Sequence, residues 1–138
     1  MTPALTGVLE TSLYVEDVPR ARAFYRALFG FEVMIEDPRF CAMSVAGKQV
    51  LLLFKKGSST SVTVVPGGDI PPHDGAGQLH LAFSVPAEAL PDWEARLSDQ
   101  GIPIESTVLW PRGGRSIYFR DPDGSLVELV TPGCWPIY

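Results

Sequence analysis

Two stretches of the same design decide the fold of this chain: ETSLYV at residues 10–15 and HLAFSV at residues 80–85. In each stretch apolar side chains alternate with polar or small ones, which is typical of a strand with one face on a core. Each stretch leads into a proline-containing amphipathic segment that ends in a glycine, at Gly30 and Gly101. The sequence therefore predicts two similar modules in tandem.

The first module has the order βαβββ. Asp17 suits a helix N-cap, Pro19 suits the first turn and Gly30 suits the exit, so a helix is predicted between Asp17 and Gly30. Turn residues separate three further segments that favour strands. The predicted strands of this module are 8–15, 31–36, 40–46 and 48–55.

The second module repeats this order after a connector rich in glycine and proline. Leu90, Trp93 and Leu97 mark its helix, which Gly101 closes. Its predicted strands are 79–85, 104–109, 115–120 and 125–131. We expect a single α+β domain over residues 1–138, with two tandem βαβββ modules forming a curved mixed sheet around a cleft and the helices outside. Its parts are module one (about 7–65), the connector (66–78), module two (about 79–131) and an apolar tail (132–138) that docks on the domain or on a second subunit.

The composition excludes several classes of protein. A chain of 138 residues with 46% hydrophobic and 20% charged residues is typical of one globular domain. A net charge of -5 argues against nucleic acid or an anionic membrane as partner. Residues 1–7 lack the features of a signal peptide, which predicts a cytoplasmic protein. Cys41 and Cys134 form no disulfide framework and are expected to be reduced thiols.

Metal-binding residue types recur at matching places of the two modules. Superposing the halves on their strands and glycines pairs Glu10 with His80, and Leu51 with Glu128. Glu128 falls in an otherwise apolar stripe, where a carboxylate is costly unless it is paired or binds a metal. The plainer alternatives are an arginine partner for Glu128 and a backbone hydrogen bond for His80. The joint pattern favours a metal site.

Three segments resemble the opening of a module of the vicinal oxygen chelate superfamily: LYVED at residues 13–17, AFY at 23–25 and LFGF at 28–31. The run FRDPDGSLVEL at residues 119–129 resembles its closing hairpin. That family includes glyoxalase I, fosfomycin-resistance thiol transferases, extradiol dioxygenases, an epimerase and bleomycin-binding proteins. Because one scaffold hosts such different chemistries, the resemblance implies the fold more strongly than the function.

The resemblance implies metal ligands at Glu10, His80 and Glu128. Leu51 cannot bind a metal, so the three-ligand plan of the fosfomycin enzymes and dioxygenases is favoured over the four-ligand plan of the glyoxalases. One imidazole and two carboxylates suit Mn²⁺, Fe²⁺, Ni²⁺ or Zn²⁺. The open coordination positions would suit a substrate with two adjacent oxygens. Glu10 could instead act as a general base without a metal beside it.

The resemblance also implies residues that contact the substrate. Ser12 and Tyr118 match positions that do so in fosfomycin-type proteins, although Tyr118 could also merely line the sheet. The loop WPRGGR at residues 110–115 carries Arg112 and Arg115, which could bind an anionic group or remain solvated. His73 is interpreted as a solvated histidine of the connector.

Three functions follow, in order of preference. The first is a divalent-metal enzyme that acts on a small oxygen-rich molecule by thiol transfer or lyase chemistry. The second is a metal-free protein that binds or sequesters a small molecule. The third is an extradiol-type dioxygenase, which would normally supply two histidines and one carboxylate. The resemblance further implies a homodimer, often with each site built from opposite modules of two subunits.

Overall fold

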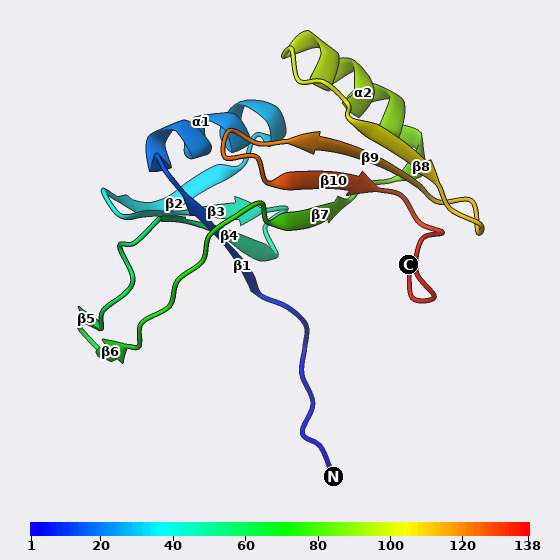
Figure 1. Cartoon of the computed structure of the whole chain (residues 1–138). Helices are drawn as coiled ribbons and strands as arrows, with labels where there is room; N and C mark the ends of the chain where they lie inside the picture. Colours follow the sequence, from blue (N-terminus) through cyan, green and yellow to red (C-terminus); the bar gives the residue numbers. More distant parts are fainter. The chain divides into compact units, whose positions relative to one another are not determined.

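The computed structural model describes residues 1–138 and divides into two compact units, Met1–Ala76 (unit 1) and Gly77–Tyr138 (unit 2). Each unit holds a four-stranded mixed sheet and one α-helix (Figure 1). The predicted α+β class with two modules of the same order is confirmed. Neither α-helix has the length and apolar character that crossing a membrane requires.

Unit 1 contains a sheet in the order β1-β4-β3-β2, in which β1 runs parallel to β4 and the other neighbours are antiparallel. A small antiparallel hairpin, β5–β6, follows the sheet along the chain. The elements are β1 (Glu10–Val15), α1 (Val18–Phe29), β2 (Glu32–Asp37), β3 (Phe40–Val45), β4 (Gln49–Lys55), β5 (Thr63–Val65) and β6 (Gly68–Ile70).

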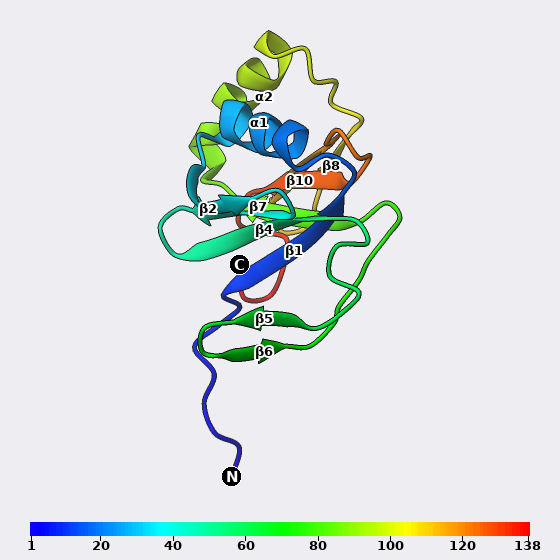
Figure 2. The same ribbon diagram turned by 90° about the vertical axis from the view of Figure 1, so that its left-hand side faces the viewer.

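Helix α1 begins and ends where its capping residues predict. The Asp17 carboxylate accepts a hydrogen bond from the Arg20 backbone N–H at 3.0 Å, which satisfies one free donor of the first turn. Gly30 ends the helix in the left-handed region, with φ of 71°, and its N–H donates to the Arg26 carbonyl. The helix lies on one face of the unit 1 sheet, and β5–β6 lies on the side of the other face (Figure 2).

Unit 2 repeats the arrangement, with the sheet order β7-β10-β9-β8. Strand β7 runs parallel to β10, and the other neighbours are antiparallel. A short 3-10 helix leads into α2, a turn not anticipated from the sequence. The elements are β7 (His80–Ser84), η1 (Ala87–Ala89), α2 (Leu90–Asp99), β8 (Ser106–Leu109), β9 (Arg115–Arg120) and β10 (Leu126–Val130).

The strand register corrects the pairing of Leu51 with Glu128. In unit 2 His80 lies opposite Leu126, two residues before Glu128; in unit 1 Glu10 lies opposite Val50, two residues before Leu52. Leu52 is therefore the counterpart of Glu128, and Leu51 is buried on the opposite face. Equal spacing from the two glycines predicts the wrong pair. The residue opposite Glu10 is Val50, three residues after Gly47, whereas the residue opposite His80 is Leu126, only two residues after Gly124.

The predicted connector is more ordered than expected. Its first part belongs to the β5–β6 hairpin, in which Thr63 lies opposite Ile70 and Val65 opposite Gly68. A turn through Pro66 and Gly67 joins the two short strands. Composition alone concealed this hairpin, because three-residue strands are too short to show an alternating pattern.

The C-terminal tail docks on its own unit through Tyr138 and through the backbone of Gly133, whose carbonyl accepts a hydrogen bond from the Gly114 N–H at 3.3 Å. The Tyr138 hydroxyl donates to the Val130 carbonyl at 3.0 Å and lies 3.3 Å from the Val85 carbonyl. Trp135 and Ile137 are 64% and 96% exposed, so the rest of the predicted apolar contact is absent from this chain.

Both cysteines are free thiols, as predicted. Cys41 is fully buried, and this burial, followed by the charge of Glu36, raises the pKa of its thiol. A neutral buried thiol is a poor nucleophile, so Cys41 is assigned to the core of unit 1.

Two glycines of unit 2 pack backbone against backbone. A Cβ added at Gly114 would lie 2.5 Å from the Gly133 carbonyl carbon. Gly114→Ala is therefore expected to lower the free energy of unfolding by about 1–3 kcal/mol, the usual cost of overpacking. Gly67→Ala is the matched control, because a Cβ there meets nothing within 4 Å. Thermal melting of both variants checks this, and equal melting temperatures would show that the Gly114 contact yields without cost.

Candidate functional site

Two of the three predicted metal ligands meet in unit 2. The parallel pairing of β7 with β10 places His80 opposite Leu126 and Glu128 opposite Ala82. The His80 Nε2 atom lies 3.3 Å from a Glu128 carboxylate oxygen. Glu128 is only 7% exposed, whereas the His80 imidazole is about half exposed. The pair thus combines a buried carboxylate with an imidazole open to a ligand.

The other nitrogen of His80 fixes the state of the ring. Its Nδ1 lies 2.9 Å from the Leu126 carbonyl oxygen, which can only accept a hydrogen bond. Nδ1 therefore carries a hydrogen, and a neutral ring presents the lone pair of Nε2 toward Glu128. Metal-binding histidines are commonly held in this way, by donating their second N–H to a carbonyl.

Glu128 accepts a hydrogen bond from a serine hydroxyl, which in turn accepts one from a tryptophan indole. The Ser116 hydroxyl donates to the second Glu128 oxygen at 2.5 Å, and the Trp110 indole N–H donates to the Ser116 oxygen at 2.8 Å. Ser116 is fully buried. A continuous chain of hydrogen-bonding groups therefore runs from Trp110 through Ser116 to the carboxylate and its neighbour His80.

The alternative interpretation of Glu128 as an arginine partner is wrong. The Arg120 guanidinium donates to Glu105 at 2.8 and 3.1 Å. Arg115 lies 3.6 Å from Glu94 on helix α2. Glu128 thus accepts a hydrogen bond from Ser116 and lies against His80, and its partner is not a guanidinium.

The geometry of the pair fits a shared cation. Metal-to-ligand distances near 2.0–2.2 Å place neighbouring ligand atoms roughly 2.8–3.6 Å apart in octahedral or tetrahedral sites. The 3.3 Å between Nε2 of His80 and the Glu128 oxygen falls within this span. Two lone-pair atoms facing each other at this distance need a proton or a metal ion between them, which makes the donor set suitable for a borderline divalent cation.

Tyr118 lies beside this pair, opposite Glu128 across the β9–β10 ladder. Its ring centroid is 6.4 Å from that of His80. Burial, and to a lesser degree the negative charge of Glu128, raises the pKa of the Tyr118 phenol. The phenol therefore stays protonated at neutral pH and can donate a hydrogen bond, which suits contact with an oxygen-bearing ligand better than a role as base. It lines a shallow hollow with Glu105, Ser106, Arg120 and Leu126.

The structure does not bring the two loop arginines to the His80–Glu128 pair. Ser116 faces Glu128, so the neighbouring Arg115 side chain leaves the opposite face of β9, where it meets Glu94 of α2. Arg112 is exposed in the β8–β9 turn, which the Gly113 N–H closes by donating to the Trp110 carbonyl. Anion binding by either arginine stays a prediction.

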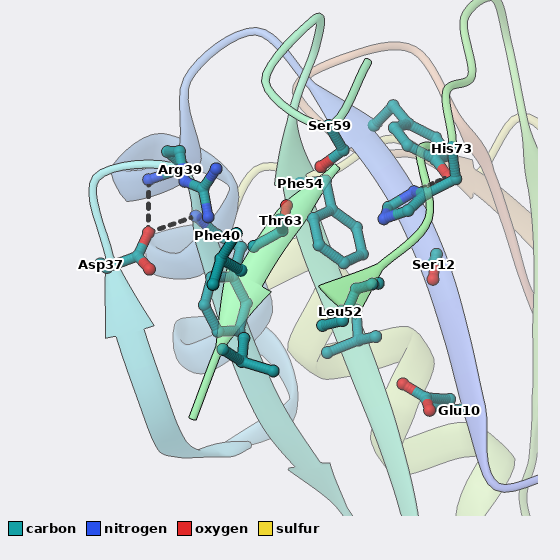
Figure 3. A pocket seen from close by; sticks show the side chains of 14 residues that line it. Glu10, Ser12, Asp37, Arg39, Phe40, Leu52, Phe54, Ser59, Thr63 and His73 are labelled. Carbon is teal, nitrogen blue, oxygen red and sulfur yellow. Dashed lines mark hydrogen bonds between the residues drawn. The ribbon is translucent and has the colours of Figure 1, made fainter. Parts of the chain in front are cut away.

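The third predicted ligand, Glu10, lies in unit 1. Glu10, Ser12 and Tyr14 alternate along β1 and line one pocket of about 760 Å³. Figure 3 labels Glu10 and Ser12 in this lining. This confirms the predicted face of the strand, because Leu13 and Val15 are buried on the other face. Neither unit by itself contains three His, Cys, Asp or Glu side chains grouped closely enough to hold a metal ion. The meeting of Glu10 with His80 and Glu128 stays a prediction.

The sequence analysis did not predict the residues that form the walls of the unit 1 pocket. Phe40, Phe54 and His73 line it together with Leu52 (Figure 3). The Tyr14 hydroxyl lies 2.7 Å from Nδ1 of His73, so this histidine is not a freely solvated loop residue. No periodic signal marks His73, since it follows two prolines in an aperiodic segment. The pocket volume falls in the range that accommodates small organic ligands.

Comparison with known proteins places these observations in context. Residues 7–129 match the family model described as Glyoxalase/Bleomycin resistance protein/Dioxygenase superfamily. The crystal structure of lactoylglutathione lyase from Agrobacterium tumefaciens is similar, with a TM-score of 0.88 and 32% identity over 97% of this chain and 99% of that one. Metallothiol transferase FosB of Bacillus licheniformis is 28% identical over 92% of this chain and 76% of its own length. Biphenyl-2,3-diol 1,2-dioxygenase 3 of Rhodococcus globerulus is 30% identical over 94% of this chain, which spans 63% of that relative.

Proposed function

The chain belongs to the glyoxalase/bleomycin resistance protein/dioxygenase superfamily, and on this premise we propose that it is a divalent-metal-dependent enzyme acting on a small oxygen-rich molecule by thiol transfer or lyase chemistry. The observation that carries the proposal is the His80–Glu128 pair. Its two ligand atoms lie 3.3 Å apart, and the remaining ring nitrogen of His80 faces the Leu126 carbonyl. The names of two relatives, a metallothiol transferase and a lactoylglutathione lyase, support this choice of reaction classes.

In this proposal Glu10, His80 and Glu128 hold the cation, which would polarise substrate oxygens as a Lewis acid. Tyr118 donates a hydrogen bond to a substrate oxygen, because its raised pKa keeps the phenol protonated. Ser12 lines the unit 1 pocket on the same strand face as Glu10 and offers a second hydroxyl to the substrate. Glu10 can alternatively take a proton from the substrate as a general base.

Elemental analysis tests the metal directly. Protein purified without chelator or affinity tag is expected to contain Mn, Fe, Ni or Zn at close to one equivalent. Glu10→Gln is expected to lower the affinity at least about tenfold, because a neutral amide replaces a carboxylate ligand. Glu16→Gln, at an exposed position beyond the pocket-lining part of β1, serves as the matched control. Metal that stays substoichiometric in the wild type after addition of each cation would contradict the proposal.

A metal-free binding or resistance protein is the second candidate, and one feature of unit 1 favours it. The counterpart of Glu128 is Leu52, which lines a pocket with Phe40 and Phe54 and offers apolar contact instead of a ligand atom. A wild-type protein that retains no cation yet binds small molecules would support this candidate. A dioxygenase ranks third, since one histidine and two carboxylates depart from the usual iron site.

We further propose a homodimer, on the ground of the family. A module of about 65 residues buries little surface by itself, so the two modules pair either within the chain or across such a dimer. Light scattering coupled to size-exclusion chromatography is expected to give twice the chain mass of 15.0 kDa. A monomer at micromolar concentration would contradict this part of the proposal and leave the metal site untouched.

A further inference from the structure

His73 is fixed in the unit 1 pocket by three separate contacts. Its backbone N–H donates to the Ser59 carbonyl at 2.9 Å. Its Nδ1 atom lies 2.7 Å from the Tyr14 hydroxyl, and the ring meets Phe54 edge-on with centroids 4.6 Å apart. A connector histidine with no function would need none of these contacts, whereas a histidine that acts on a ligand needs a defined orientation.

The backbone beside His73 is shaped to lie against the same tyrosine. A Cβ added at Gly75 would lie 2.3 Å from Cδ2 of the Tyr14 ring, so only glycine allows the chain to pass this close. Because Gly75 and His73 both contact Tyr14, the connector is attached to β1 rather than hanging free. The imidazole is therefore part of the pocket and not of a mobile tip.

The contact with Tyr14 leaves one ring nitrogen of His73 for a ligand. Either the Tyr14 phenol donates to Nδ1 and Nε2 carries the hydrogen, or Nδ1 donates to the phenol oxygen and Nε2 is free to accept. Nε2 has no hydrogen-bond partner in the protein, and His73 lines the cavity (Figure 3). The pair can thus present either a donor or an acceptor to a bound molecule.

The aromatic side chains beside the pair lie nearly parallel to one another. Tyr14 and Phe54 have centroids 5.9 Å apart and planes 25° apart, and Phe40 and Phe54 have centroids 5.9 Å apart and planes 23° apart. Near-parallel rings of this kind suit stacking against a planar molecule. A cage for a cation would need several ring faces turned toward one centre. All three rings are half-buried, so part of each remains accessible.

Glu10, Asp37 and Arg39 also line the cavity. Asp37 is engaged by the backbone N–H groups of Arg39 and Phe40, at 2.7 and 3.1 Å. His73, paired with Tyr14, lies beside the aromatic rings of the same cavity.

We propose that the His73–Tyr14 pair is a proton-exchange site for a planar aromatic ligand with an ionisable hydroxyl group. The ring stacks on Phe54 and the hydroxyl meets Nε2 of His73. The O–H bond of the ligand breaks as an N–H bond forms at Nε2, giving a phenolate beside an imidazolium whose Nδ1–H donates to the Tyr14 oxygen. Tyr14 is the positioning residue of the pair. The site does not depend on the proposed cation.

Titration with 4-nitrophenol, whose ionised form absorbs visible light, tests this site. At a slightly acidic pH, where the free phenol is mainly protonated, the wild-type protein is expected to produce saturable phenolate absorbance, with or without chelator. His73→Gln is expected to abolish this signal and to weaken binding about tenfold or more, the contribution of a hydrogen bond to a charged group. Lys48→Gln, exposed in the β3–β4 turn, is the control and should match the wild type.

Tyr14→Phe provides a second measurement, in which the affinity for the probe separates the proposed role from a purely structural one. It keeps the ring stacked on Phe54 but removes the partner of Nδ1. The imidazole nitrogen signals of His73 are then expected to shift, and affinity for 4-nitrophenol to fall severalfold. Assignment is simple because the chain has only two histidines.

Three results would overturn the proposal. These are absence of binding to the wild type at millimolar phenol, an unchanged phenolate signal in His73→Gln, and loss of the signal on chelation, which would place the hydroxyl at a cation. A protein that holds no metal but still ionises the probe through His73 would refute the proposed metal function alone. The two proposals can therefore fail separately.

Discussion

Glu128→Gln is expected to remove the bound cation and leave unit 2 folded. Glutamine has the size of glutamate, and its carbonyl oxygen can still accept from the Ser116 hydroxyl. Its amide N–H group can donate to the lone pair on Nε2 of His80. No buried polar neighbour loses its partner, so the apo protein should melt close to the wild type. Substitution of a residue that only hydrogen-bonds to a metal ligand lowers metal affinity by ~10–100-fold. Loss of the ligand itself should lower it further.

Equilibrium dialysis against Mn²⁺ and Zn²⁺, combined with thermal melting of the metal-free proteins, measures both effects. Glu94→Gln is the matched control, because Glu94 pairs with Arg115 on the other side of the same sheet at 3.6 Å. That partly exposed pair should contribute at most about 1 kcal/mol and nothing to metal binding. The contrary result has two parts: the wild type binds no metal, and Glu128→Gln melts at a clearly lower temperature than the wild type. Together they would show that Glu128 serves only as the counter-ion of a protonated His80.

Ser116→Ala is expected to weaken metal binding about 10–100-fold, although Ser116 would not touch the metal. The Ser116 hydroxyl is the donor that holds one Glu128 oxygen, and the Trp110 indole holds the hydroxyl in turn. Without it the carboxylate is freer to turn, and the indole N–H loses its acceptor. The free energy of unfolding should also fall by about 1–3 kcal/mol, the cost of leaving buried polar groups unpaired.

Trp110→Phe separates the two effects. It keeps a large ring and removes only the N–H that donates to Ser116, so metal affinity should fall less than in Ser116→Ala. Ser98→Ala, at an exposed position on α2, controls for the loss of a hydroxyl. Isothermal titration with Mn²⁺ gives the affinities. Wild-type affinity in Ser116→Ala would mean that the hydroxyl stabilises the fold without positioning the ligand.

Features with a local cause were predictable from the sequence. Strand alternation placed Glu10, Ser12 and Tyr14 on one face of β1, because the side-chain period of two depends only on neighbouring residues. Asp17 and Gly30 predicted the ends of α1, since capping involves groups within one turn. The order of elements in each module follows from the same local signals.

Features that depend on distant contacts were not predictable in this way. The error at Leu51 came from counting residues after a glycine, whereas the register depends on how each turn is closed. His73 lies 59 residues from Tyr14 in sequence, and nothing in the connector reveals that contact. Whether Glu10 joins His80 and Glu128 depends on contacts of the same long-range kind.

The shared register of the two sheets shows how the repeated modules have diverged. Leu52 stands where unit 2 has Glu128, and Phe40 stands where unit 2 has Ser116. One copy thus keeps the carboxylate together with the hydroxyl that supports it, and the other replaces both with the wall of a pocket. Duplication supplies two versions of each position, so a residue given up by one copy can be retained by the other.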